Sequence, residues 1–245
     1  MTALWVSGAT CVMTFGGGLI ALRLQAYRGL VLAFCAGALV AGALMDVIPH
    51  ALQLLESTQQ SRFHPHHLLL ACSLGFLGFY LFEHAAHHSE AQDHPSHYNH
   101  TCQAGAWGAA GIGVHSFFDG LAIAGAFQAG NEVGWVVSLA VLLHKLADGA
   151  STVGVMLGTQ HSANATTAML SVTALAPIAG VMTQSVLRVP KPVLALTLGW
   201  FAGVFLYLGA SSLLPAAHEA GHSRWLPLAT LAGAAVVYLA QMLAE

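Results

Sequence analysis

Charge is the scarcest property of this sequence. Only 7% of its 245 residues are Asp, Glu, Lys or Arg, whereas 56% are apolar, and the formal net charge is −3. An ordinary soluble domain carries about 25% charged residues, so this composition excludes that class. Several apolar runs reach roughly 18 residues or more, enough to cross a hydrocarbon core of ~30 Å. The composition therefore predicts an all-α integral membrane protein.

Two further absences narrow the expectation. No Lys or Arg precedes Arg23, so residues 1–22 lack the charged opening of a cleavable signal peptide and are expected to remain as a membrane span. The cysteines form no CxxC pair and lie among apolar residues, which favours buried packing over a disulfide or a thiolate metal site. They are Cys11, Cys35, Cys72 and Cys102.

Polar breaks divide the chain into eight expected membrane spans with short loops. These spans cover residues 2–22, 30–55, 66–87, 103–129, 133–159, 164–187, 192–217 and 225–243. The exception among the loops is 84–102, which holds six of the fifteen histidines, at positions 84, 87, 88, 94, 97 and 100. This His-rich loop either captures or senses metal, or is a solvated linker.

Loop charges do not orient these spans. Three cations fall on each side of the membrane, so the excess of Lys and Arg that marks a cytoplasmic face is missing. The two sets are Arg23, Arg28 and Arg224 on one side, and Arg62, Arg188 and Lys191 on the other.

An internal repeat relates the second and seventh spans. "AGALVAGALMDVIPHA" from Ala36 and "AGVFLYLGASSLLPAA" from Ala202 align without gaps, which places Pro49 opposite Pro215. Four spans lie between them, so the second and seventh spans run in opposite directions, as inverted repeats of secondary transporters do. Chance similarity is the alternative, because Ala, Gly and Leu dominate both segments.

The fourth and fifth spans each contain His, three residues, Asp and then Gly. An ionisable side chain at the bilayer centre costs roughly 2.5 to 3.5 kcal/mol, so a repeated pair requires an explanation. Residues i and i+4 share a helix face, and two imidazoles with two carboxylates suit Zn²⁺ or another borderline divalent cation. We predict that His115, Asp119, His144 and Asp148 hold one ion. Alternatively, each His bonds its own Asp and only holds helices together.

The glycine after each aspartate extends this pattern. Gly120 and Gly149 remove bulk, and we expect them to let the fourth and fifth spans approach closely enough to share ligands.

These residues resemble those of the ZIP (Zrt/Irt-like protein) family of divalent-metal transporters. "HSFFDG" and "HKLADG" match the family's fourth- and fifth-span motifs, and "MDVIPH" and "SSLLPA" are similar to its proline motifs in the second and seventh spans. The resemblance implies a single transmembrane transporter domain over residues 1–245. Its eight helices would have the ZIP-like 3+2+3 arrangement with inverted repeats.

The resemblance also implies roles for individual residues. His115, Asp119, His144 and Asp148 would form the primary transport site. Family members with two metals use further ligands that here are replaced by other residues. These replacements are Ser116, Lys145 and Ala176.

Lys145 would then stand in for the second ion and leave a mononuclear site. Its ammonium would partly neutralise the carboxylates when no metal is bound. The alternative is that Lys145 snorkels, or faces a water-filled crevice without touching the site.

Two further groups could pass ions to or from the centre, or could reflect ordinary interfacial polarity. Asp46 and His50 share a face of the second span, whereas His218, Glu219 and His222 end the seventh.

The expected function is import of a divalent metal toward the cytoplasm by elevator-like alternating access. Zn²⁺ is the first expectation, with Cd²⁺, Fe²⁺, Mn²⁺, Co²⁺ and Ni²⁺ left open. The resemblance implies termini outside, and the compact chain with its short loops suggests a bacterial inner membrane as the setting. The expected partners are the ion and the bilayer, with no nucleic acid and with a homodimer left open.

Two alternatives belong to other classes. A membrane-embedded zinc hydrolase could use these ligands with Ser116 nearby, although the chain has no HExxH motif and no assignable proton-shuttling acid. A metal receptor without transport is the third possibility.

Overall fold

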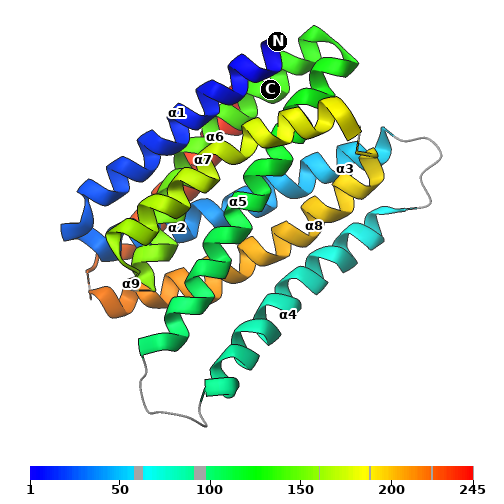
Figure 1. The fold of residues 1–245 in the computed structure, drawn as a ribbon. Helices are drawn as coiled ribbons and strands as arrows, with labels where there is room; N and C mark the ends of the chain where they lie inside the picture. The colour runs from blue at the N-terminus through cyan, green and yellow to red at the C-terminus, as the bar shows by residue number, and fades with distance from the viewer. Residues whose placement is uncertain (58–62, 91–97, 160, 188, 222, 245) are drawn as a thin grey trace.

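The computed structural model describes residues 1–57, 63–90, 98–159, 161–187, 189–221 and 223–244. Within these ranges the chain is helical, without a strand, and forms one bundle of long helices (Figure 1). The main elements are α1 (Thr2–Arg23), α2 (Arg28–Ala41), η2 (Gly42–Val47), α3 (Ile48–Glu56), α4 (Pro65–Glu90), α5 (Tyr98–Ala129), α6 (Asn131–Gly158), α7 (Ala163–Leu187), α8 (Lys191–Tyr207), η3 (Leu208–Leu213), α9 (Leu214–Ala220) and α10 (Leu226–Ala244). The short 3₁₀ turn η1 (Gln25–Tyr27) joins α1 to α2.

The predicted membrane spans match these elements closely. Among the described residues, seven helical segments are long and apolar enough to cross a bilayer, and α10 adds a shorter apolar stretch at Leu226–Leu239. The second and seventh predicted spans each comprise an α-helix, a π-helical turn and another α-helix. The all-α membrane fold expected from the sequence is therefore confirmed.

The predicted loop at 84–102 is too long. Helix α4 continues to Glu90 and α5 already begins at Tyr98, so helix takes up both ends of the predicted linker. The polar histidines there do not prevent helix formation, because helices can extend beyond the apolar core of the membrane. His94 and His97 fall outside the described residues.

A shared irregularity supports the internal repeat. The π-helical turns η2 and η3 occupy aligned positions, and each is followed by a proline, Pro49 or Pro215. Proline has no N–H and clashes with the carbonyl four residues before it, which here is that of Met45 or Ser211. Both carbonyls lie inside the wider π turn, which explains why the helix is irregular at this point in each copy.

The two copies run in opposite directions. The side chain of Lys191, the first residue of α8, donates to Ser57 Oγ at 3.3 Å, just beyond the end of α3. At the other end of the bundle, the start of α2 packs against the end of α9, where a Cβ built on Gly29 would lie 3.1 Å from the carbonyl oxygen of Ala217. The start of each copy thus lies beside the end of the other.

Four helix pairs are held in very close contact by reciprocal glycines. In each pair, a Cβ built on either glycine would lie 1.9 to 2.0 Å from a backbone carbonyl oxygen of the opposite helix. Such backbone contact is typical of membrane helices, which associate through small residues. The pairs are α1 with α6 (Gly17, Gly149), α5 with α7 (Gly120, Gly180), α2 with α10 (Gly37, Gly233) and α4 with α8 (Gly75, Gly203).

These pairs divide the bundle into two groups. We call α1, α5, α6 and α7 the site group, and α2, η2, α3, α4, α8, η3, α9 and α10 the flanking group. Between the groups, the glycines of α6 meet side chains instead of backbone: a Cβ built on Gly154 would lie 3.0 Å from Cys35 Sγ, and one on Gly158 would lie 3.3 Å from a methyl of Leu32. The closest backbone packing therefore occurs inside each group.

Candidate metal site

Two neighbouring helices supply six polar side chains to one buried point. His115, Ser116 and Asp119 come from α5, and His144, Lys145 and Asp148 come from α6. All six are buried. Their three- and four-residue spacings put each set on one helix face, as the sequence predicted.

The four predicted ligands come together. His115, Asp119, His144 and Asp148 each offer one ligand atom, and these atoms all lie within 4.8 Å of one another. The Nε2 atoms of His115 and His144 lie 3.4 and 3.6 Å from Asp119 Oδ2. Ligands around a tetrahedral Zn²⁺ at ~2.0–2.2 Å are separated by roughly 3.3–3.5 Å, so these separations suit a shared ion.

Lys145 lies between the two carboxylates. Its Nζ is 2.5 Å from Asp119 Oδ2 and 2.6 Å from Asp148 Oδ2, and it donates to Ser116 Oγ at 2.9 Å. The side chain is 0% exposed. It therefore touches the site instead of snorkelling to the membrane surface.

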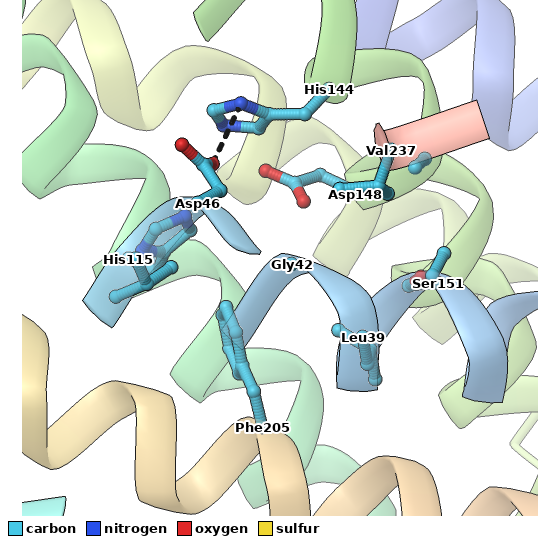
Figure 2. A pocket seen from close by; sticks show the side chains of 12 residues that line it. Leu39, Gly42, Asp46, His115, His144, Asp148, Ser151, Phe205 and Val237 are labelled. Atoms are coloured by element: carbon cyan, nitrogen blue, oxygen red, sulfur yellow. Dashed lines mark ion pairs between the residues drawn. The ribbon is translucent and has the colours of Figure 1, made fainter. Parts of the chain in front are cut away.

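The flanking group adds one more carboxylate to the cluster. Asp46, in the π turn η2, points toward His144, with Oδ2 3.1 Å from His144 Nδ1 (Figure 2). Figure 2 also shows Asp148 and His115 facing the same space from α6 and α5. His144 thus lies between carboxylates of the two groups, Asp46 on one side and Asp119 on the other.

The charges of the cluster are unbalanced. Asp46, Asp119 and Asp148 bring three negative charges and Lys145 brings one positive charge, so with neutral imidazoles the sum is 1 − 3 = −2. One divalent cation would balance this charge. Buried charges are costly unless they are paired, which favours a cation at this point.

A cavity leads from the cluster toward one end of the bundle. It has a volume of about 220 Å³ and reaches the exposed side chain of Gln53 in α3. We call this end, where α1 begins and α10 ends, the open side (Figure 1). The lining residues are Met45, Asp46, Val47, Pro49, His50, Gln53, His115, Asp119, Ala122, Val137, Val141, His144, Leu198 and Gln241.

On the side of the cluster that faces the opposite end of the bundle, the closed side, the cluster adjoins a much smaller space. A void of about 20 Å³ adjoins His144 and Asp148, and Leu39 and Phe205 help to enclose it (Figure 2). Such a void is about the size of one water molecule. The site therefore communicates with the open side.

The other predicted residues are distributed unevenly. His50 lines the cavity, and its buried Nε2 has no hydrogen-bond partner among the described residues. His218 and Glu219 are exposed in α9, away from the cluster, and His218 Nδ1 lies 2.8 Å from the Leu214 carbonyl oxygen. His222 lies outside the described residues.

Sequence reasoning did not identify two polar residues of the cavity, Gln53 and Gln241. Gln53 lies three residues after His50, so the polar face begun by Asp46 and His50 could have revealed it. Gln241 is isolated in the last helix and carried no such signal. It reaches the cavity only because α10 packs against α2.

The interpretation of the two glycines is wrong. Gly120 approaches the Pro177 carbonyl in α7, and Gly149 approaches the Thr14 carbonyl in α1, so neither lies between α5 and α6. Each is adjacent in sequence to a predicted ligand aspartate but faces away from the candidate site. These glycines fix the ligand helices onto outer supports.

The cysteines lie apart from the ligand cluster, as predicted. Cys35 and Cys72 are buried, Cys11 is partly buried, and all three are free thiols. The side chain of Cys102 lies outside the described part of the chain.

Comparisons with known proteins identify the family. The ZIP Zinc transporter family matches residues 2–108 and 104–241. A protein named zinc transporter zipt-7.1, from Caenorhabditis briggsae, is 33% identical over 134 residues, which cover 52% of this chain and 34% of that protein. The chain thus matches about a third of that relative's length. Because the family match extends over nearly the whole sequence, this chain belongs to the ZIP zinc transporter family, a family of membrane transporters and not of enzymes.

Proposed function

We propose that this protein carries Zn²⁺ across a membrane through a mononuclear site formed by His115, Asp119, His144 and Asp148. The observation that carries the proposal is the cluster of four buried side chains, whose ligand atoms lie within 4.8 Å of one another. With neutral imidazoles, the net charge of these groups with Asp46 and Lys145 is −2, which one divalent cation would neutralise. Two imidazoles and two carboxylates form a ligand set that suits zinc. Cd²⁺, Fe²⁺, Mn²⁺, Co²⁺ and Ni²⁺ are further candidates that the same ligands would accept.

Lys145 takes the place of a second ion in this proposal. Its ammonium contacts both carboxylates and Ser116, so it occupies space that another cation would need. At an effective dielectric of 20, two unit charges 4 Å apart interact by ~4 kcal/mol, so the tethered charge strongly stabilises the empty site. The unloaded carrier can then return without exposing two unpaired carboxylates to the membrane interior.

Asp46 and His50 form the approach to the site. Both line the cavity on the open side, and Asp46 already contacts His144. An incoming ion would exchange water for these side chains before it reaches the four ligands. His218 and Glu219 lie in the part of the chain where an ion could leave on the closed side.

Transport proceeds by an elevator-like movement of the site group against the flanking group. The close glycine contacts lie within the groups, so the site group can shift as a unit. The family resemblance gives import toward the cytoplasm, with both termini outside, and the compact chain with its short loops favours a bacterial inner membrane as the setting. The open side then faces outward. The resemblance leaves a homodimer open, and nucleic acid has no role.

Metal flux into proteoliposomes tests the proposal. The parent protein should carry Zn²⁺ and Cd²⁺ to an internal dye, whereas Asp119→Ala and Asp148→Ala should each reduce flux by at least ~10-fold, because even residues that only support metal ligands affect affinity by ~10–100-fold. A matched control is Glu56→Ala, an exposed acid that does not line the cavity. Equal flux in the parent and both aspartate variants would show that these aspartates do not form the transport site.

A further inference from the structure

Three histidines gather on the open side at the start of α4. Their ring centroids are separated by 5.6 Å for His64 and His66, 6.0 Å for His64 and His67, and 4.0 Å for His66 and His67. The side chains of His64 and His66 are exposed, and that of His67 is partly exposed. We call these three residues the α4 histidine cluster.

The α4 histidine cluster lies close to the cavity. Leu68, the next residue, packs on Gly199, which follows Leu198 in the cavity wall. Helix α3, which supplies the exposed cavity residue Gln53, ends at Glu56, and His64 follows eight positions later in the sequence. An ion held by these histidines would therefore be near the entrance.

We propose that the α4 histidine cluster is a separate capture site for a borderline divalent cation such as Zn²⁺ or Ni²⁺. Imidazole suits these ions, and exposed side chains can turn so that their nitrogens converge on one ion. Pro65 lies between the first two histidines and limits the backbone at the helix start. His67 Nδ1 accepts a hydrogen bond from the His64 backbone N–H at 3.0 Å, so coordination through this nitrogen replaces that bond.

The role of the capture site rests on the proposed function, but its test does not require transport. Zinc should protect His64, His66 and His67 from modification by diethyl pyrocarbonate, measured peptide by peptide on the full-length protein. In His66→Ala, protection of the other two histidines should require a zinc concentration at least ~10-fold higher, as expected when a chelating group is lost. His161→Ala, which removes a histidine from another loop, is the matched control.

Two results would overturn the capture site. One is the absence of zinc protection at micromolar zinc. The other is protection that His66→Ala leaves unchanged, since it would show independent binding by single imidazoles. If protection is normal but vesicles carry no zinc, the proposed transport function fails and the capture site stands.

A second, independent contact joins the two helix groups on the closed side. Arg28, the first residue of α2, donates through Nη2 to the carbonyl oxygens of Leu157 and, at 3.0 Å, Gly158. These are the last two residues of α6. The cavity meets α6 near its other end, at Val137 and Val141, so the arginine contact lies beyond the site from the cavity.

The chemistry of this contact is favourable. The carbonyls at a helix C-terminus have no intrahelical donor and carry partial negative charge, so a guanidinium is a suitable partner. The surroundings of the side chain are apolar, since Ala21, Val31, Leu32, Gly154 and Leu157 share a small void with it. Arg28 Nε is buried and has no hydrogen-bond partner among the described residues.

We infer that Arg28 is a positioning residue that holds the site group and the flanking group together while the closed side is shut. Because the inference involves movement between the groups, it rests on the proposed elevator mechanism. For the site group to move past α2, the bonds to Leu157 and Gly158 must break. Weakening them should favour the state that opens toward the closed side.

Native Cys35 reports on this contact without any metal movement. It is buried in α2 beside Gly154 of α6, so it lies at the surface that would separate. In a protein whose other cysteines are replaced by serine, Arg28→Gln should raise the rate of N-ethylmaleimide labelling of Cys35 by ~10-fold, the size expected for loss of hydrogen bonds from a charged donor. Arg23→Gln, which alters an exposed arginine nearby, should leave the rate unchanged.

Arg28→Lys keeps a cationic donor and should label at a rate between those of the parent and Arg28→Gln. If Arg28→Gln does not fold, the labelling rate of Arg28→Lys serves as the test. Labelling of Cys35 that is equal in the parent and in the folded Arg28 variants would overturn the inference. Faster labelling without zinc flux would support the contact and reject the transport function.

Discussion

At the scale of single residues, the site depends on a balance of buried charge. Three carboxylates and one ammonium meet around two imidazoles, so the empty site is partly neutralised by Lys145 and lacks two positive charges. The ammonium lowers the cost of placing these carboxylates between membrane-spanning helices. In the proposed transport site, a metal ion and the lysine would compete for the same oxygens.

Replacement of the lysine tests this competition. Lys145→Ala should tighten equilibrium zinc binding by at least ~10-fold, because removal of a cation near the carboxylates removes several kcal/mol of repulsion. It should also slow zinc turnover, because the empty carrier loses its internal counter-ion. Isothermal titration and vesicle flux measure the two effects, with Lys191→Ala, an exposed cation, as the control. Unchanged affinity and unchanged flux would reject the surrogate-ion proposal.

The carboxylate of Asp46 gives a second residue-level prediction. Asp46→Asn should weaken zinc binding by ~10-fold, because it removes a charge that contacts a ligand histidine from the opposite group. Ser212→Ala is the matched control, since Ser212 holds the equivalent position of the repeat in η3. Equal zinc affinities in the parent and both variants would show that Asp46 does not contribute to zinc binding.

At the scale of helices, glycines determine how closely the elements pack. Gly17 of α1 and Gly149 of α6 each meet a carbonyl of the opposite helix, so this pair cannot accept even a methyl group without moving apart. The movement would displace the supports of Asp148, one residue before Gly149. Helix packing and ligand geometry are therefore coupled through α6.

Two alanine substitutions in one helix test this packing. Gly17→Ala would place a Cβ 1.9 Å from the Leu146 carbonyl oxygen and should destabilise the protein by ~1–3 kcal/mol, the usual cost of overpacking. Gly8→Ala lies in the same helix with nothing within 4 Å, so it should be neutral or slightly stabilising. Thermal unfolding in detergent compares them, and equal midpoints would contradict the proposed role of close packing.

Helical periodicity was enough to predict which side chains share a helix face. The spacing of His115 to Asp119 and of His144 to Asp148 was enough to place each pair on one face. The contact between Asp46 and His144 could not be predicted, because it depends on a π turn that alters the register of α2 and on packing between distant segments. The glycine partners and Arg28 were missed for a similar reason, since the sequence does not show which helices become neighbours.

At the scale of the whole molecule, two groups of helices meet around the site. The site group carries the four proposed ligands, and the flanking group contributes Asp46 and encloses the closed side with Leu39 and Phe205. The inverted copies in the flanking group, each with a π turn before a proline, give it a related shape on both sides of the membrane. This symmetry suits alternating access.

Cross-links distinguish movement within groups from movement between them. In Gly154→Cys, the new Cβ would lie 3.4 Å from the Cβ of native Cys35, close to the ~3.5–4.5 Å of a disulfide, so oxidation should join the groups and stop zinc flux reversibly. Gly113→Cys with Thr173→Cys would join α5 to α7 inside the site group and should preserve flux, since a Cβ on Gly113 lies 3.5 Å from Thr173 Oγ1. Full flux through the oxidised Gly154→Cys protein would exclude the elevator mechanism.

Anomalous diffraction at the zinc edge, from crystals of the full chain soaked in zinc, tests the central claim most directly. The account predicts one zinc peak among His115, Asp119, His144 and Asp148, with the ammonium of Lys145 still beside the carboxylates. Two peaks in this cluster, or none while zinc binds elsewhere, would contradict a mononuclear site built from these four side chains.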